Sequence, residues 1–380
     1  MKIIEDGTVT NPKGYKGAGL HIGIKKKNKD FALIVSDVEA RAVGTFTTNM
    51  VKAAPVLWDK QVVENGDTVK AIGIANACTG KLGEEANEKF ANIVGNALNV
   101  EKEKVLTCST GVIGKQLSTD PIEKGIDEAL KQLKDDHQAG IDVATSIMTT
   151  DTKPKHLAVE IEVKGKTVTI GACCKGSGMI HPNMATMLGF ITTDLNISKE
   201  LLNKALKSVI PDTFNMISVD RDTSTNDTVL LLANGLAGND EIVKEDEDYQ
   251  TFKEALYYVN EYLAKCIASD GEGATKLLEV NVNGAKDVKQ AKVIAKSICT
   301  SPLVKTAIFG NDANWGRLLC AMGYSGEEFD PYQVDLYIES EFGNLKLVEN
   351  GMATDYSEEF ATKILSSDYV KTNIEMKIAD

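Results

Sequence analysis

The chain has 380 residues, of which 43% are hydrophobic and 26% are charged, and its formal net charge is −13. This composition is ordinary for a globular protein of two or three domains, and the acidic balance argues against a general role on nucleic acids or membrane surfaces. Seven irregularly spaced cysteines, no signal-peptide core in residues 1–13 and no apolar run of about 18 residues lead us to expect a cytoplasmic protein.

Helix-like and strand-like patterns alternate along the chain. Apolar residues at helical spacing predict helices, and short runs of β-formers predict strands. In chain order we expect a strand over 71–77, a helix over 86–98, a strand over 105–108, a helix over 121–135, a strand over 167–173, a helix over 252–267, and strands over 278–282 and 334–338. The fold class is therefore a layered α/β or α+β sandwich.

Thr186 is the first candidate for a chemical role. It lies in the segment Lys175–Leu188, where Pro182 and Asn183 favour a turn before the Ala185–Thr186 bond. A threonine hydroxyl is a poor nucleophile at neutral pH, but cleavage before Thr186 would give it an adjacent α-amine with a pKa of about 7.7–8.0 as base. The alternative is a glycine-punctuated turn that leads into an apolar segment.

Six segments in one order carry a family resemblance. They are Cys108–Gly114, Met148–Thr152, Lys175–Leu188, Ser218–Thr228, Asp270–Lys276 and Asn314–Arg317. Together they resemble the ornithine acetyltransferase (glutamate N-acetyltransferase, ArgJ) family of arginine biosynthesis, from about Gly14 to Asn373.

The resemblance implies an enzyme that cleaves itself between Ala185 and Thr186, giving an α chain of 1–185 and a β chain of 186–380. Thr186 would take the acetyl group of N-acetylornithine and pass it to glutamate in a ping-pong reaction. Some members also accept acetyl-CoA as a donor; no other cofactor and no metal is implied. The implied fold is a sandwich similar in layout to N-terminal-nucleophile hydrolases, and the implied assembly is an α2β2 heterotetramer.

Thr110 and Gly111 match the residues that form the family's oxyanion hole. Attack on an amide carbonyl develops a negative oxygen, which preplaced hydroxyl and N–H donors stabilise. Without the family, the same residues are equally well read as a tight turn after the strand at 105–108.

The family's substrate-binding positions fall on the nucleophile Thr186 and on four further residues of this chain. A lysine there holds a carboxylate or lowers the pKa of the new amine, and a glutamate there binds an ammonium group. The further positions are Thr149, with Thr150 as the alternative, Lys175, Glu272 and Asn373. From composition alone, Lys175 and Glu272 would be solvated surface residues.

The chain departs from the family pattern at two places. Arg221 stands where the family usually has glycine, so the backbone there need not require a positive φ. Ile378 stands where the family has a threonine or serine that contacts substrate. We therefore assign no substrate contact to this position. The loop from Asp220 to Asp227 fails the calcium-loop pattern, and we interpret it as a hydrogen-bonded polar turn.

Two other functions use the same residues differently. A hydrolase or aminopeptidase with the nucleophile Thr186 would pass the acyl group to water. A non-catalytic binding protein would keep Thr186 inside an intact chain of 41.0 kDa.

Overall fold

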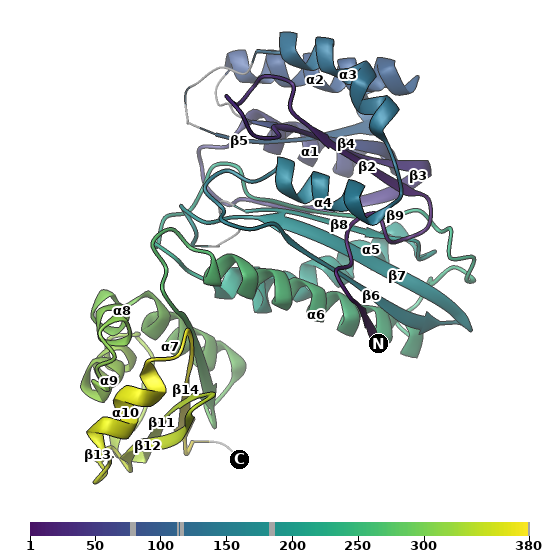
Figure 1. Cartoon of the computed structure of the whole chain (residues 1–380). Coiled ribbons are helices and arrows are strands. Elements are labelled where there is room, and N and C mark those ends of the chain that lie inside the picture. Colours follow the sequence, from purple (N-terminus) through teal and green to yellow (C-terminus); the bar gives the residue numbers. More distant parts are fainter. Residues whose placement is uncertain (77–80, 112–113, 115–117, 182–186, 379–380) are drawn as a thin grey trace. The chain divides into compact units, whose positions relative to one another are not determined.

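A computed structural model describes the chain except for residues 77–80, 112–113, 115–117, 182–186 and 379–380 (Figure 1). The chain divides into two units. Unit 1 contains Met1–Asn215 and Asp222–Glu272, and unit 2 contains Met216–Arg221 and Gly273–Asp380. Each unit has its own core and is described by itself.

Unit 1 is built on a 9-stranded sheet of order β1-β6-β7-β8-β9-β3-β4-β5, with β2 also paired to β3. The β4–β5 and β8–β9 pairs are parallel, and the remaining pairs are antiparallel. The strands are β1 (Lys2–Ile4), β2 (Tyr15–Leu20), β3 (Phe31–Phe46), β4 (Thr68–Asn76), β5 (Val105–Thr110), β6 (Lys155–Val163), β7 (Lys166–Lys175), β8 (Leu188–Thr193) and β9 (Thr228–Ala233).

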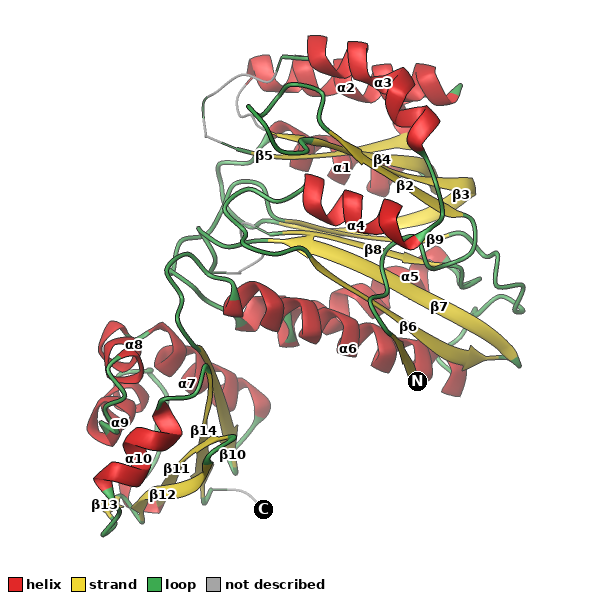
Figure 2. Cartoon of the chain, viewed as in Figure 1, coloured by secondary structure: helices red, strands yellow, loops and turns green. Residues whose placement is uncertain are grey.

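The long strand β3 divides this sheet into two halves that face each other. Residues 31–35 pair with β4, residues 41–46 pair with β9, and the pairing is irregular between Val35 and Ala40. Figure 2 shows the result as one layer containing β2, β4 and β5 and a second layer containing β6 to β9. Ile72 and Leu106 of the first layer share one buried cluster with Phe190 and Leu230 of the second. The bend therefore closes the sheet on its own core.

Six helices of the described part of unit 1 pack on these layers: α1 (Ala54–Asn65), α2 (Lys81–Leu98), α3 (Asp120–Gln132), α4 (His137–Ser146), α5 (Lys199–Val209) and α6 (Glu247–Ser269). Helices α1 and α4 contribute Val62, Val63 and Val143 to the cluster between the layers. Helices α2 and α3 cover the other face of the first layer, and α5 and α6 pack against the second (Figure 2).

Unit 2 has a 5-stranded sheet of order β10-β14-β11-β12-β13, in which β10 and β14 are parallel. Apolar residues of its helices and strands, among them Ile298, Leu336 and Ile374, form a separate buried cluster. Its elements are β10 (Leu277–Asn283), α7 (Val288–Thr300), α8 (Pro302–Phe309), α9 (Trp315–Gly323), β11 (Val334–Ser340), β12 (Gly343–Glu349), β13 (Met352–Ala353), α10 (Glu358–Leu365) and β14 (Tyr369–Met376).

The layered α/β class predicted from the sequence is confirmed, and so are the predicted elements. The helices over 86–98 and 252–267 lie inside α2 and α6, and the five expected strands correspond to β4, β5, β7, β10 and β11. The helix predicted over 121–135 ends earlier, at Gln132. Its last residues are extended because Lys134 exchanges backbone hydrogen bonds of 2.8 and 3.1 Å with Gly17.

The predicted division into 1–185 and 186–380 does not coincide with the two units. Strands β7 and β8, which lie on opposite sides of the predicted cut, pair with each other from Lys175↔Leu188 to Ile170↔Thr193. Cleavage itself stays a prediction, and two cleaved chains would share one sheet.

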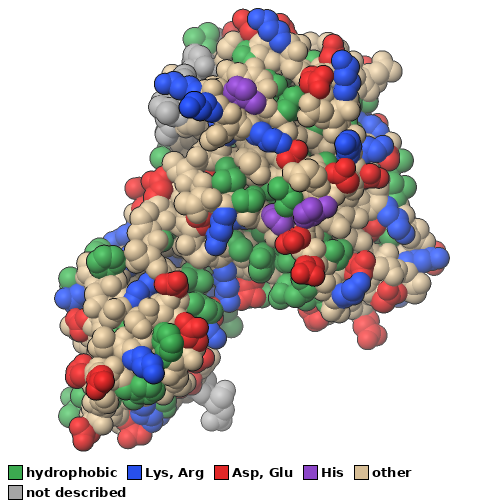
Figure 3. Space-filling model, in the orientation of Figure 1, with side chains coloured by type: hydrophobic (Ala, Val, Ile, Leu, Met, Phe, Trp, Pro, Cys, Tyr) green, Lys and Arg blue, Asp and Glu red, His purple; other side chains and the backbone are tan. Residues whose placement is uncertain are grey.

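The surface of unit 1 mixes charges of both signs. On the face displayed in Figure 3, Lys and Arg side chains are interspersed with Asp and Glu side chains. Among the described helices, none has the length and apolar character needed to cross a membrane.

Candidate active site

Lys175 is buried at the end of β7, with 2% of its surface exposed. Its Nζ donates a hydrogen bond of 2.7 Å to Thr149 Oγ1 and lies 3.8 Å from Asp151 Oδ2. Burial lowers the pKa of the Lys175 ammonium, and the carboxylate of Asp151 opposes this shift. The reading of Lys175 as a solvated surface lysine is therefore wrong. Thr149, whose side chain is exposed, is the predicted threonine that contacts it.

A buried ion-pair network supports this lysine. Asp151 Oδ1 accepts hydrogen bonds from Lys155 Nζ (2.6 Å) and from the Gly176 N–H (2.7 Å). Lys155 Nζ also donates to Asp270 Oδ2 at 2.5 Å. Asp151, Gly176 and Asp270 belong to three different family-like segments. The network therefore fixes these three segments against one another.

The network also sets the charge of its members. Burial would raise the pKa of Asp151, but Lys175 and Lys155 together lower it below its usual value. Burial would likewise raise the pKa of Asp270, and hydrogen bonds from Lys155 and Thr152 lower it instead. Both carboxyl groups are therefore ionised at neutral pH.

Glu272 lies beside the segment that follows Lys175. Its backbone N–H donates to the Ser177 carbonyl at 2.9 Å. Its carboxyl group rests over Gly178, where an added Cβ would lie 2.5 Å from Glu272 Cδ. Glu272 is exposed, so its carboxylate is open to a cation. The predicted residues Thr149, Lys175 and Glu272 are thus brought together by the chain segments that carry them.

Thr110 ends β5 with a buried side chain, 4% exposed. Among the described residues, its Oγ1 has no hydrogen-bond partner. Gly111 follows it and is exposed. A buried hydroxyl without a partner is costly unless something engages it in the working state, which fits the predicted role of a preplaced donor.

The predicted cleavage site, Ala185 and Thr186, lies outside the described residues. The next residue, Met187, is described. Its N–H donates to Asp227 Oδ1 at 2.9 Å, and its carbonyl accepts from the Thr228 N–H at 3.1 Å. The neighbouring Asn226 donates from Nδ2 to the carbonyl of Ser109, which precedes Thr110, at 2.7 Å.

The polar loop before β9 is hydrogen-bonded, as predicted, and its backbone has a positive φ at the position where the family usually has glycine. Arg221 has φ = +71°, so the backbone there does adopt the left-handed conformation that glycine favours. No group of three His, Cys, Asp or Glu side chains among the described residues is arranged to hold a metal ion.

Asn373 belongs to unit 2, in the middle of β14. Its Oδ1 accepts from Asn281 Nδ2 at 2.9 Å, and its Nδ2 donates to Glu339 Oε2 at 2.8 Å. These bonds form a polar row across β10, β14 and β11. The substrate contact assigned to Asn373 by resemblance stays a prediction.

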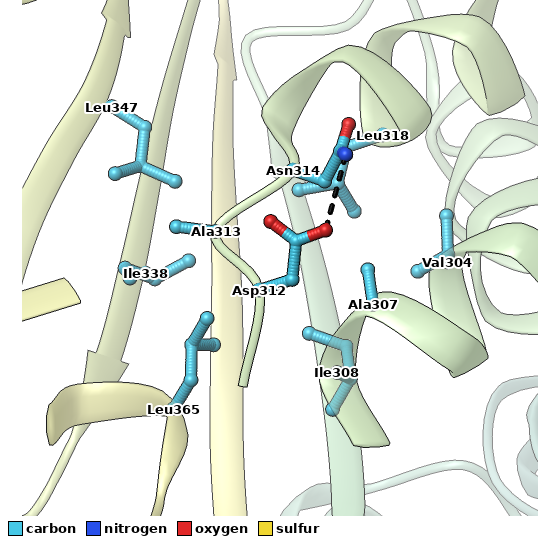
Figure 4. Close-up of a pocket in the computed structure, with 10 residues that line it drawn as sticks. All are labelled: Val304, Ala307, Ile308, Asp312, Ala313, Asn314, Leu318, Ile338, Leu347 and Leu365. Atoms are coloured by element: carbon cyan, nitrogen blue, oxygen red, sulfur yellow. Dashed lines mark hydrogen bonds between the residues drawn. The ribbon is translucent and has the colours of Figure 1, made fainter. Parts of the chain in front are cut away.

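A small pocket in unit 2 is lined by none of the predicted residues. Figure 4 shows it between α8, α9, α10, β11 and β12, with apolar side chains such as Ile308, Leu318 and Leu347 around it. Its polar members are Asp312 and Asn314, joined by a hydrogen bond of 3.2 Å from Asn314 Nδ2 to Asp312 Oδ2. Because most of its lining belongs to the core of unit 2, we interpret it as a packing gap.

Sequence reasoning missed three groups of this site: Lys155, the carboxylate of Asp227 and the amide of Asn226. The two loop residues stand inside a family-like segment, which was the available signal. Their partners, Met187 and Ser109, are distant in sequence, so spacing could not identify them.

Comparisons with known proteins agree with the resemblance. The sequence model described as the ArgJ family matches residues 16–380. The arginine biosynthesis bifunctional protein ArgJ of Thermotoga neapolitana is 50% identical over 371 residues, which cover 96% of this chain and 93% of that protein. The glutamate N-acetyltransferase of Methanocaldococcus jannaschii is 45% identical over 390 residues, covering 100% of this chain and 94% of that protein. A crystal structure of the bifunctional ArgJ protein from Bacillus halodurans is 47% identical, with a TM-score of 0.49, and covers 51% of this chain and 90% of that chain.

Proposed function

This chain belongs to the ArgJ family, a family of arginine-biosynthesis enzymes, and from that premise we propose that it transfers the acetyl group of N-acetylornithine to glutamate. The observation that carries the proposal is the relationship over residues 16–380. It includes one relative named as an arginine biosynthesis bifunctional protein, at 50% identity, and one named as a glutamate N-acetyltransferase, at 45%. The same relationship makes the non-catalytic alternative the weaker one.

The proposed reaction has two half-reactions on one threonine. The Oγ of Thr186 attacks the acetyl carbonyl of N-acetylornithine and forms an ester, while its α-amine takes the hydroxyl proton. That proton passes to the departing nitrogen, and ornithine leaves. The amine of glutamate then attacks the ester, the α-amine takes its proton and returns it to Oγ, and N-acetylglutamate leaves.

The described residues support specific parts of this scheme. The unengaged hydroxyl of Thr110 and the N–H of Gly111 supply donors for the negative oxygen of each tetrahedral intermediate. Lys175 and Thr149 bind a substrate carboxylate, and Glu272 binds the ammonium group of ornithine. Asn373 completes the substrate contacts in this proposal.

The proposed nucleophile arises by self-cleavage between Ala185 and Thr186. We propose that the resulting chains, 1–185 and 186–380, remain together in an α2β2 assembly in the cytoplasm. Acetyl-CoA serves as a second acetyl donor, and no bound cofactor or metal takes part.

One preparation tests the proposal. Denaturing mass spectrometry should find two fragments in place of one chain of 41.0 kDa, and sequencing should read Thr-Met-Leu-Gly at one new N-terminus. Thr186→Ala should remain a single inactive chain, and Thr186→Ser, which keeps a hydroxyl, should still cleave. An active preparation that shows only the Met1 start would contradict the scheme.

Incubation with N-acetylornithine, with and without glutamate, separates the transferase from the alternative amidohydrolase or aminopeptidase. The transferase forms N-acetylglutamate and releases little acetate. Equal acetate release in both mixtures would support the hydrolase. Release of CoA from acetyl-CoA and glutamate tests the second donor.

A further inference from the structure

Two adjacent residues, Asn226 and Asp227, reach the two strands that carry the proposed chemistry. Strand β5 ends at Thr110, in the first layer of unit 1, and strand β8 begins at Leu188, in the second. Strands β9, β3 and β4 separate β8 from β5 along the sheet. The loop before β9 nevertheless contacts both strand ends.

Asp227 holds the residue that follows the proposed nucleophile. The Asp227 side chain is fully buried, its Oδ1 accepts the Met187 N–H at 2.9 Å, and its backbone carbonyl accepts the Thr47 N–H at 2.9 Å. The carbonyl of Met187 accepts from the Thr228 N–H. Both backbone polar groups of Met187 are therefore fixed by two consecutive residues.

Asn226 holds the residue before the proposed oxyanion donor. Its Nδ2 donates to the Ser109 carbonyl at 2.7 Å, and its Oδ1 accepts from Thr225 Oγ1 at 2.6 Å. The second bond orients the amide, so that its nitrogen faces Ser109. The peptide group between Ser109 and Thr110 is held from outside β5 as a result.

The proposed acetyl transfer requires the strand ends that carry the nucleophile and the oxyanion donor to be held at a fixed distance. A nucleophile and its oxyanion donor work only at near-contact distances, and a displacement of about 1 Å can cost roughly a hundredfold in rate. Here the strands next to the two groups, β8 and β5, belong to different layers of a sheet that is closed by a bend in β3. Two adjacent side chains that bind both layers limit that displacement.

We propose that Asn226 and Asp227 are positioning residues that fix Met187, which follows the proposed nucleophile Thr186, relative to Ser109, which precedes the proposed Thr110–Gly111 oxyanion hole. This inference rests on the proposed function of Thr186. Neither side chain needs to touch substrate. Burial raises the pKa of Asp227 well above its usual value. An amide is its closest replacement because it keeps the size and the oxygen that accepts the Met187 N–H.

The test compares two replacements of Asp227 with a matched control. Asp227→Asn keeps a neutral oxygen acceptor for the Met187 N–H, whereas Asp227→Leu has similar size and no acceptor. Asp194 is the control because it is also a buried carboxylic acid that accepts backbone N–H groups, from Thr169 (2.8 Å) and Lys13 (3.1 Å), outside the site.

We expect Asp227→Leu to slow self-cleavage and to lower kcat by about a hundredfold, with KM changed less than about threefold. Asp227→Asn should restore most of both rates. Asp194→Leu should lower the melting temperature and leave the kcat of the folded fraction unchanged. Equal kcat in Asp227→Leu and Asp194→Leu, or equal impairment in Asp227→Leu and Asp227→Asn, would overturn the proposal.

Asn226 gives a second test if Asp227→Leu does not fold. Asn226 is partly exposed, and Asn226→Asp replaces the donor to the Ser109 carbonyl with an acceptor. It should lower kcat by about tenfold or more, because the peptide before Thr110 is released. Asn234→Asp, in which a loop donor to the Lys13 carbonyl is lost, is the control and should keep its kcat.

Assays of the wild-type protein distinguish failure of the proposed function from failure of the positioning role. If it cleaves and transfers but the Asn226 and Asp227 variants match their controls, the positioning role fails alone. If wild type neither cleaves nor transfers, the proposed function fails, and the positioning role fails with it.

Discussion

For the single residue Lys175, composition predicts an exposed side chain, but the structure buries it. A lysine after a strand is usually solvated, but here Asp151 receives hydrogen bonds from Lys155 and Gly176 and lies near the Lys175 amine. The family resemblance identified Lys175 and Thr149, and the structure brings them into contact. The supporting Lys155 could not be predicted, since a buried charge is defined by its partners rather than by its neighbours in sequence.

Thr110 leads to a prediction about catalysis without loss of stability. Its Oγ1 has no partner in the described part of the chain, so Thr110→Val removes the hydroxyl, keeps the shape and breaks no hydrogen bond to a described residue. We expect kcat to fall by about 10²–10³ while the melting temperature stays within a few degrees of wild type. Thr110→Ser should retain most of the activity. Steady-state kinetics and thermal melts measure both effects, and an unchanged kcat in Thr110→Val would remove Thr110 from the oxyanion hole.

The carboxylates of Asp151 and Asp270 predict sensitivity to acid. Their pKa values are lowered in the folded state, while in the unfolded chain they are near 3.9. Their contribution to stability is therefore fully present above about pH 4 and is lost as the pH falls through the folded pKa values. Urea unfolding from pH 7 to pH 3 should show the free energy of unfolding decreasing below about pH 4. In Asp151→Asn this decrease should be smaller, and an identical decrease would exclude Asp151 as its source.

At the scale of elements, local patterns predicted the amphipathic helices and the strands with clear ends. Strands β8 and β9 were not predicted. Every residue of each is buried, so neither shows the alternation of a half-exposed strand; β5 is buried throughout as well, but its short apolar start at 105–108 was recognised. The bend in β3 was also missed. It joins two layers through an irregular pairing between Val35 and Ala40, which leaves no periodic signal. Contacts such as Asn226 to Ser109 depend on that bend, so no local pattern could predict them.

The packing of two segments at Gly178 gives a prediction at this scale. A Cβ at Gly178 would lie 2.5 Å from Glu272 Cδ, and the far end of a flexible side chain can move away. Gly178→Ala should therefore fold normally, displace the Glu272 carboxylate and raise KM for N-acetylornithine severalfold with a smaller change in kcat. Gly323→Ala is the control, since a Cβ there meets nothing within 4 Å. Equal KM values in the two variants would argue against a substrate role for Glu272.

For the whole molecule, the boundary between the two units and the predicted cleavage site are different features. The cores of unit 1 and unit 2 are separate clusters, and the chain passes between them at 215–216, 221–222 and 272–273. The predicted cut falls inside unit 1, between two paired strands. Cleavage at this position would therefore divide one sheet rather than separate two domains.

This arrangement predicts that cleaved chains stay together. Fragments 1–185 and 186–380 share the β7–β8 pairing and the cluster that contains Cys173 and Phe190. Native size-exclusion chromatography should give one peak at the volume of uncleaved Thr186→Ala, and only a denaturant should resolve two fragments. Separation without a denaturant would mean that the shared sheet does not hold the cleaved protein.

The bend in β3 also sets an order of events during synthesis on the ribosome. Residues 41–46 are translated early, but their partner β9 is completed only at Ala233, well beyond Thr186. Until then the second layer lacks a central strand, and Met187 lacks the two residues that hold its backbone. A nascent polypeptide that stalls before Asp227 should thus remain uncut. In the proposed scheme, the N-terminal threonine would form only after β9 and the residues before it have folded.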